Sequence, residues 1–156
     1  IFAREEINID LKIQELLPYI QQAAEKKDPS TTQAALELSE LLTTVHPNEA
    51  KAFAAHADLL YHNGAVESAQ LNYERTLELD DTVYTVWEQL LYIYGAQKNY
   101  KLLAQKSEEA IDLFPNQVRL YFLNGTAQHY LGAYEEAIDI LEEALLMSGG
   151  DAALQA

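Results

Sequence analysis

The sequence contains no cysteine, and it has only four prolines and six glycines among its 156 residues. Without cysteine, neither a disulfide framework nor a thiolate metal site can form. Scarce proline and glycine leave room for long helices and few elaborate loops. No apolar run approaches the roughly 18 residues that a membrane-spanning helix needs. Since apolar residues still make up 49% of the chain, these absences favour a folded domain with an ordinary core.

Basic residues are also scarce, with 10 Lys and Arg against 25 Asp and Glu and a formal net charge of −15. Nucleic-acid binding depends on Lys and Arg that neutralise phosphates, so we do not expect a nucleic-acid partner. An anionic membrane surface is disfavoured for the same reason, and direct insertion into a membrane is not expected. The simplest interpretation of the charge is solubility.

A period of 34 residues runs through the sequence. Pro47 and Pro115 stand 68 residues apart, which is twice this period, and so do Gly64 and Gly132. Positions one period apart carry related side chains in three sets, which are Val66, Tyr100 and Tyr134; Ala69, Leu103 and Ala137; and Leu77, Ile111 and Leu145. Many independent coincidences at one period indicate a tandem repeat of one supersecondary unit.

Apolar residues inside each period follow helical spacing. Trp87, Leu90, Leu91 and Tyr94 form an i, i+3, i+4, i+7 stripe, which is typical of a helix with one buried face. The pattern predicts two helices in each period, seven or eight main helices in all, and no sheet. It also predicts that Trp87, the only tryptophan, is buried.

Residues between the helical stretches suggest where each helix begins and ends. The expected N-caps of the first helix in each unit are Asn48, Thr82 and Asn116. Gly64 and Gly132 suit the left-handed position in the turn between paired helices, and we assign Asn99 to that position in the middle repeat.

The 34-residue pattern resembles that of the tetratricopeptide repeat (TPR) family, in which aromatic, small, glycine and proline positions recur. The middle repeat carries the pattern at Trp87, Leu90, Tyr94, Tyr100, Ala110 and Pro115. Three repeats are expected at 50–83, 84–117 and 118–151, and a degenerate one at 16–49. The resemblance implies an all-α fold, a right-handed superhelical α-solenoid of helix–turn–helix hairpins.

The two ends of the chain are interpreted separately. Residues 1–15 form an N-terminal helix or extended segment; we favour a helix from about Asp10, bent or interrupted near Pro18. Residues 152–156 resemble the start of a truncated next helix with Asp151 as its N-cap. We therefore interpret the chain as a fragment of a longer array, and its uncapped ends leave self-association open.

The resemblance implies a function without catalysis: a scaffold that binds a partner protein or peptide segment on the concave face of the superhelix. The alternative is a structural spacer or self-assembly element within a larger multi-repeat protein. We expect no catalytic residues, no cofactor and no metal. The resemblance to multi-repeat bacterial proteins of this family is clearest at 86–91 and 114–117, and it leaves the compartment open between the cell envelope and the cytoplasm.

The resemblance also implies which residues face the partner. The predicted partner-binding residues are Lys51, Asp58, Tyr61 and His62 in one repeat, Glu88 and Tyr92 in the next, and Arg119, Phe122, Thr126 and His129 in the last. Aromatic rings supply contact area in such surfaces and charges set orientation. The alternative for any single residue is that its ring packs against a neighbouring helix and binds nothing.

Histidines and clustered acids have simpler explanations than a metal site. We expect His56 to be a buried or half-buried structural residue. His62 and His129 stand two repeats apart, roughly 20 Å at ordinary helix spacing, too far to share a metal at Zn–N distances of about 2 Å. An acidic stripe, predicted to be a solvated convex face, comprises Glu135, Glu136, Asp139, Glu142 and Glu143.

Overall fold

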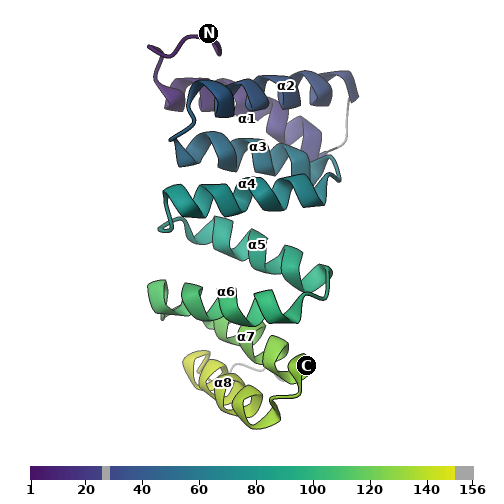
Figure 1. Ribbon diagram of the computed structural model, residues 1–156, viewed down its shortest axis with the longest axis vertical. Helices are drawn as coiled ribbons and strands as arrows, with labels where there is room; N and C mark the ends of the chain where they lie inside the picture. The colour runs from purple at the N-terminus through teal and green to yellow at the C-terminus, as the bar shows by residue number, and fades with distance from the viewer. Residues whose placement is uncertain (26–28, 150–156) are drawn as a thin grey trace. The chain divides into compact units, whose positions relative to one another are not determined.

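The computed structural model describes residues 1–25 and 29–149, which contain eight α-helices and no strand (Figure 1). The all-helical prediction is therefore confirmed for these ranges. The helices are α1 (Ile9–Ala24), α2 (Pro29–Val45), α3 (Ala50–His62), α4 (Val66–Leu79), α5 (Tyr84–Ala96), α6 (Tyr100–Leu113), α7 (Val118–Leu131) and α8 (Tyr134–Met147). The chain divides into two compact units, unit 1 up to Val86 and unit 2 from Trp87. Residue 150 and the predicted helix start at 151–156 lie outside the described residues.

Unit 1 is built around α3, which packs against α1, α2 and α4. Leu16, Leu42 and Ala52 are fully buried where the first three helices meet. Ala35 and Leu59 form a second buried cluster. The alanines at these contacts let the helices lie close together, and the leucines fill the space that remains.

Helix α1 continues through Pro18 without the interruption that the sequence suggested. Proline lacks the N–H that would bond to the carbonyl of Gln14. Both residues are exposed, so water can take the place of the missing donor. The first eight residues form turns that precede the helix.

A buried lysine holds these turns in place, and no sequence pattern pointed to it. Lys12 is 0% exposed. Its Nζ donates to the carbonyls of Phe2 (3.1 Å) and Arg4 (2.6 Å) and to Nε2 of His46 (2.7 Å). Three acceptors match the three N–H groups of an ammonium, so the buried charge is fully hydrogen-bonded. Lys12 thus ties the N-terminal turns to the end of α2.

Unit 2 is built around α7, which packs against α6 and α8. Trp87 is 4% exposed, which confirms its predicted burial, and Leu90, Leu103 and Leu120 are buried with it. A buried polar contact joins α7 to α6, because Asn124 Nδ2 donates to the Ala104 carbonyl (2.9 Å) and to Ser107 Oγ (2.8 Å). Ser39 and His56 form the equivalent contact in unit 1, two periods earlier.

The predicted N-caps are wrong by one residue. Helices α3, α5 and α7 begin two residues after Asn48, Thr82 and Asn116. The N-cap of α3 is Glu49, which is extended (φ −105°, ψ 108°) and makes no side-chain cap. The Glu49 N–H donates to the His46 carbonyl (3.2 Å), which closes a turn with Pro47 and Asn48 at its centre. Proline and asparagine are ordinary residues of such a turn, and turn formation decides their place here.

The left-handed turn between paired helices recurs at intervals of one period. Gly64 (φ 84°) and Gly132 (φ 83°) adopt it, as predicted. In the middle repeat Lys98 (φ 57°) adopts it, so the assignment to Asn99 is wrong. Asn99 is instead the N-cap of α6, and its side-chain oxygen accepts from the Leu102 N–H (3.3 Å). Asparagine is a preferred N-cap, so Asn99 takes the capping position. Lys98 takes the left-handed position because it stands one period from both Gly64 and Gly132.

Candidate functional site

The predicted residues on α3, here called the α3 patch, are Lys51, Asp58, Tyr61 and His62. Lys51 is exposed and its Nζ lies 2.5 Å from the exposed Asp10 carboxylate. The hydrogen bond to Asp10 raises the pKa of Lys51. Tyr61 and His62 contact each other edge to face, with ring centroids 5.9 Å apart.

Asp58 has a different environment from the rest of the α3 patch. It is half-buried, and its carboxylate accepts a hydrogen bond from the hydroxyl of buried Tyr73 on α4 (2.6 Å). Burial raises the pKa of Asp58, and the Tyr73 hydrogen bond and the nearby His62 partly oppose that shift. Burial and the adjacent carboxylate also raise the pKa of Tyr73. Asp58 therefore links α3 to α4 in addition to standing at a predicted binding position.

Three predicted residues in unit 2 come together in space. Arg119 on α7 donates from Nη1 to Glu88 Oε1 (3.0 Å) and to the Tyr92 hydroxyl (2.5 Å), both on α5. Its guanidinium carbon lies 5.8 Å from the centroid of the Tyr92 ring. A planar guanidinium can make these contacts together, whereas an ammonium is a compact point charge. The cluster holds one cation in a fixed position on an exposed surface.

The other predicted residues on α7 are Phe122, Thr126 and His129, and only Phe122 lies next to Arg119 along the helix. Phe122 is 46% exposed and lies one turn beyond Arg119. The Thr126 hydroxyl donates to the Phe122 carbonyl (2.7 Å), so this donor is used within the helix. His129 lies two turns from Phe122 and contacts other rings. We name Glu88, Tyr92, Arg119 and Phe122 the α5–α7 patch.

An aromatic cluster surrounds His129, and the sequence reasoning did not identify it as a group. The His129 ring lies 5.5 Å from the rings of Tyr130 and of Tyr134. Tyr130 stacks on Tyr100, with centroids 4.2 Å apart and planes 9° from parallel. Tyr100 and Tyr134 are one period apart, and this recurrence is the feature of the sequence that could have indicated the cluster. Tyr130 stands two periods after His62 and one period after Ala96, so no aromatic residue recurs at every repeat there and the period gave no sign of the stack.

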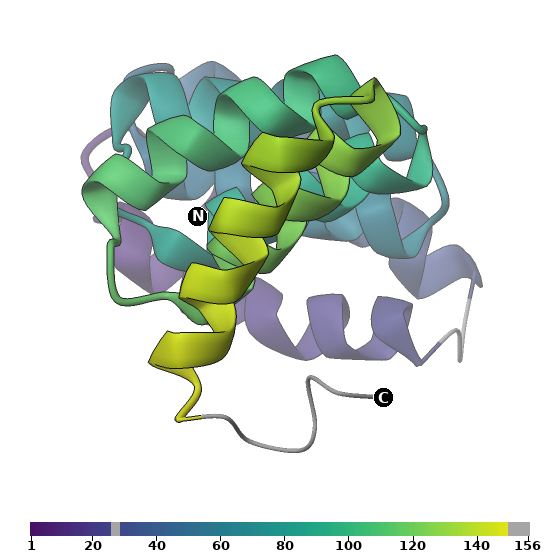
Figure 2. The same cartoon turned by 90° about the horizontal axis from the view of Figure 1, so that it is seen from below.

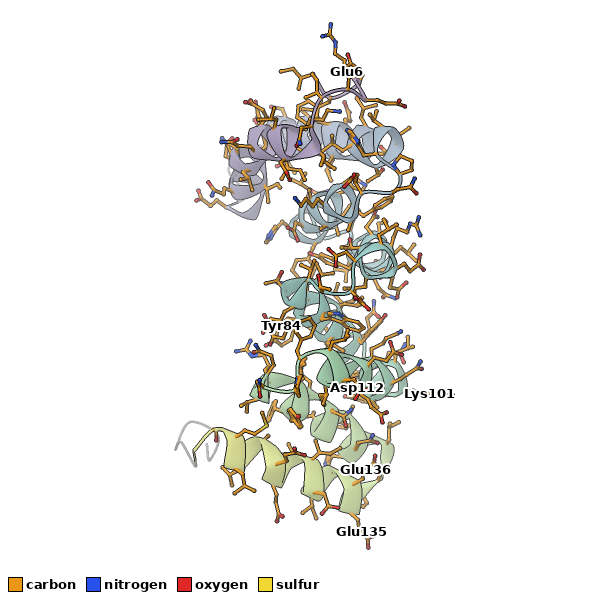
Figure 3. All side chains as sticks on the ribbon, turned by 90° about the vertical axis from the view of Figure 1, so that its left-hand side faces the viewer. Glu6, Tyr84, Lys101, Asp112, Glu135 and Glu136 are labelled. Carbon is orange, nitrogen blue, oxygen red and sulfur yellow. The ribbon has the colours of Figure 1, made fainter. Side chains whose placement is uncertain are left out.

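A cavity of about 350 Å³ opens beside Phe122, and α8 provides most of its wall. It is lined by Phe122, Ile138, Leu141, Glu142, Ala144 and Leu145. Figure 2 looks onto α8, which no other helix of unit 2 overlies in that view. All five residues of the predicted acidic stripe are exposed, and Figure 3 shows Glu135 and Glu136 at the start of α8. Glu142 differs from the others in lining an apolar cavity.

Within residues 1–25 and 29–149, no three His, Asp or Glu side chains gather in a way that could hold a metal ion. His56 is half-buried, as predicted, and lies 2.7 Å from Ser39 Oγ through Nδ1. None of the described helices combines the length and apolarity that crossing a bilayer requires.

Comparison with known proteins gives matches among solved structures alone. No protein-family model matches the chain, and no curated protein matches it. MamA 41-end from Desulfovibrio magneticus RS-1 is 17% identical with a TM-score of 0.72, over 92% of this chain and 79% of that one. YrrB, a TPR protein with an unusual peptide-binding site, is 17% identical with a TM-score of 0.68, over 94% and 75%. PilF of Pseudomonas aeruginosa is 20% identical with a TM-score of 0.65, over 92% and 65%.

Proposed function

We propose that this chain, which has the fold of tetratricopeptide repeat proteins, is a non-catalytic scaffold that binds a segment of a partner protein. The proposed binding surface is the exposed side of the first helix of each hairpin, that is, of α3, α5 and α7. In a TPR solenoid this side forms the concave face. In unit 1 the proposed binding residues are the α3 patch, and in unit 2 they are the α5–α7 patch. YrrB, which has this fold, carries a peptide-binding site, and this supports a peptide or protein partner.

The observation that carries the proposal is the fixed position of Arg119 against the exposed ring of Tyr92, one helical turn before the exposed ring of Phe122. Tyr92 is 39% exposed and Phe122 is 46% exposed, although both are large rings. Exposed aromatic side chains beside an oriented charge are common at the energetic centre of protein interfaces. Glu88 and Tyr92 hold the guanidinium in place before any partner arrives, so less conformational entropy is lost on binding. This arrangement suits a partner segment with an apolar side chain next to an acceptor group.

The test is a pulldown from native extract with the parent chain and two variants. Changing Tyr61, Tyr92 and Phe122 to Ala removes the ring area, and each such truncation commonly costs about 2 kcal/mol or more at an interface centre. We expect this variant to lose the retained partner and to keep its helical circular dichroism. A partner retained equally by the parent and the ring variant would refute binding through these rings.

The control variant changes two exposed carboxylates of α8, Glu135 to Gln and Asp139 to Asn. Both residues belong to the acidic stripe and neither lines the cavity beside Phe122. Glu142 is left unchanged because it does line that cavity. The control should retain the partner as the parent does; loss in the control alone would mean that recognition is electrostatic and lies on α8.

A second candidate function, self-assembly, is favoured by the outer face of α8. Ile138 is 56% exposed and Leu145 is 37% exposed beside the 350 Å³ cavity. One period earlier, the matching face of α6 is covered by α7, and Asn124 bonds to Ser107 there. Leu141 stands one period after Ser107, so a helix that covers α8 would need an apolar residue where α7 has Asn124.

Sedimentation velocity over a range of protein concentrations tests self-assembly. If α8 docks on a second copy, the parent chain should associate as its concentration rises, and Ile138→Glu should remain monomeric. The matched control is Glu143→Gln, an exposed residue of the same helix that does not line the cavity. A monomeric parent at all concentrations would remove this candidate and leave the scaffold proposal unaffected.

A further inference from the structure

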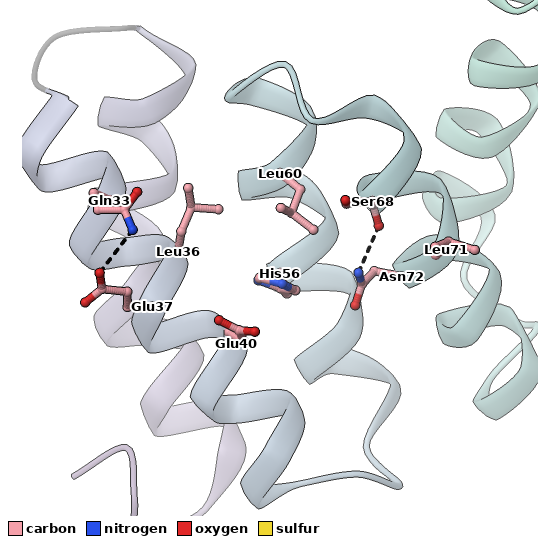
Figure 4. A pocket seen from close by; sticks show the side chains of 9 residues that line it. All are labelled: Gln33, Leu36, Glu37, Glu40, His56, Leu60, Ser68, Leu71 and Asn72. Carbon is pink, nitrogen blue, oxygen red and sulfur yellow. Dashed lines mark hydrogen bonds between the residues drawn. The ribbon is translucent and has the colours of Figure 1, made fainter.

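Unit 1 contains a separate cavity of about 360 Å³ among α2, α3 and α4 (Figure 4). It is lined by Gln33, Leu36, Glu37, Glu40, His56, Leu60, Ser68, Leu71 and Asn72. Three leucines give it an apolar wall, and two glutamates of α2 are its only acidic residues. No lysine or arginine lines it. The cavity therefore combines apolar surface with negative charge.

Part of the apolar wall is not a requirement of the repeat. Two periods after Leu60 the chain has Gln128, and two periods after Leu71 it has Asp139. The α7–α8 hairpin thus forms with polar side chains at these two positions. One period after Leu60 the chain has the buried Tyr94, whereas one period after Leu71 it has Gln105, so the repeat does not require an apolar side chain at the Leu71 position. Leu71 is nevertheless 64% exposed. The fold accepts aspartate at this position, so the apolar side chain that Leu71 presents beside the cavity is a feature of this site and not of the repeat.

His56 contributes hydrogen-bonding capacity and no positive charge. The Ser39 hydroxyl donates to the Leu36 carbonyl (2.9 Å), so its oxygen accepts from His56 Nδ1, which leaves Nε2 of the ring as an acceptor. Burial lowers the pKa of His56, although the nearby Glu40 acts in the opposite direction. Asn124 and Ser107 form the equivalent contact two periods later, which shows that the contact itself belongs to the fold.

We propose that this cavity binds the side chain of an arginine on a basic segment of a partner protein. The aliphatic stem would lie against Leu36, Leu60 and Leu71, because arginine can cover apolar surface with its stem while its charged head remains at a polar rim. The guanidinium would lie at the carboxylates of Glu37 and Glu40. Its five N–H donors can serve two carboxylates at once.

The net charge of −15 supports a basic partner, since it attracts a cationic segment from a distance and disfavours an acidic one. The proposal goes beyond the scaffold function and does not depend on the α5–α7 patch. It concerns residues of α2, α3 and α4 alone, so it stands or fails separately.

The experiment is an NMR titration of the chain at pH 7.5 that follows the ring protons of His56 and the methyl groups of Leu71. The probes are acetyl-Gly-Arg-Gly-amide and the same peptide with citrulline, which keeps the shape and lacks the charge. We expect saturable shifts with the arginine peptide and at least about tenfold weaker binding of the citrulline peptide, because hydrogen bonds between charged groups contribute more than neutral ones.

Two variants complete the test. Glu40→Gln removes one carboxylate from an exposed position and should weaken the binding of the arginine peptide about tenfold. Glu135→Gln, an exposed carboxylate of α8, should change nothing. Tyr92→Ala with Phe122→Ala should also leave the titration unchanged, which separates this site from the proposed scaffold surface. The proposal is overturned if the parent shows no saturable shift, if citrulline binds equally well, or if Glu40→Gln binds as the parent does.

Discussion

Gly125 in the middle of α7 lies at a close contact between α7 and α8. A Cβ at this position would lie 2.7 Å from Leu141 Cγ, 2.9 Å from Leu141 Cδ2 and 3.3 Å from the Ala137 carbonyl oxygen. Carbon atoms in contact ordinarily lie about 3.5–4.0 Å apart. Gly125→Ala therefore requires Leu141 to move or α8 to shift away from α7.

The size of the effect follows from two opposing contributions. Overpacking a close contact usually costs about 1–3 kcal/mol, while replacing glycine by alanine inside a helix gains about 1 kcal/mol. Gly95 in α5 provides a matched control, because its nearest neighbour atom, in Leu103, would be 3.8 Å from the added Cβ, which is an ordinary contact. We expect Gly95→Ala to gain up to about 1 kcal/mol, and Gly125→Ala to be about 1–3 kcal/mol less stable than Gly95→Ala.

Urea denaturation followed by circular dichroism at 222 nm measures the difference. A variant Gly125→Ala that is as stable as Gly95→Ala would refute the close approach of α7 and α8. A further comparison tests the cause: with Leu141→Ala already present, Gly125→Ala should lose most of its penalty, because the two closest atoms have been removed and only the Ala137 carbonyl oxygen at 3.3 Å remains.

Three further predictions use the same denaturation assay. Lys98→Gly should stabilise the chain by up to about 1 kcal/mol, because Lys98 holds a left-handed conformation that glycine adopts without strain; an unchanged midpoint would contradict this. For His56 the folded-state pKa is lowered by burial, so the unfolded chain binds the proton first and stability falls as pH drops below about 6.5. His56→Asn, which copies Asn124, should show a weaker loss between pH 7.5 and pH 5, and an identical pH dependence would contradict this. Trp87→Ala should cost about 3–5 kcal/mol, and parent fluorescence typical of indole in water would refute the burial.

Local features of the sequence determined the helices and their turns. The 34-residue period and the apolar stripes within it were sufficient to predict helical hairpins without a sheet. Gly64 and Gly132 were placed correctly because glycine, which has no Cβ, adopts a positive φ without steric cost. Lys98 was missed because its side chain does not favour that conformation, although its spacing from both glycines is one period.

Boundaries were predicted less well where two local preferences compete. Asn48 can cap a helix or occupy a turn, and only the hydrogen bond from Glu49 to the His46 carbonyl decides for the turn. Pro18 can end a helix or remain in one. In each case the outcome depends on which polar groups find partners or water.

Tertiary structure alone decided the contacts between helices that give the surface its chemistry. The sequence placed Glu88, Tyr92 and Arg119 on one predicted face, but not the two hydrogen bonds that gather them around one guanidinium. It likewise contained no sign that Lys12 is buried or that Asp58 bonds to Tyr73. Helical periodicity is set by neighbours within one turn, whereas these contacts join residues 8 to 34 positions apart. They depend on distances between elements and on rotamers that exist only once the helices have packed.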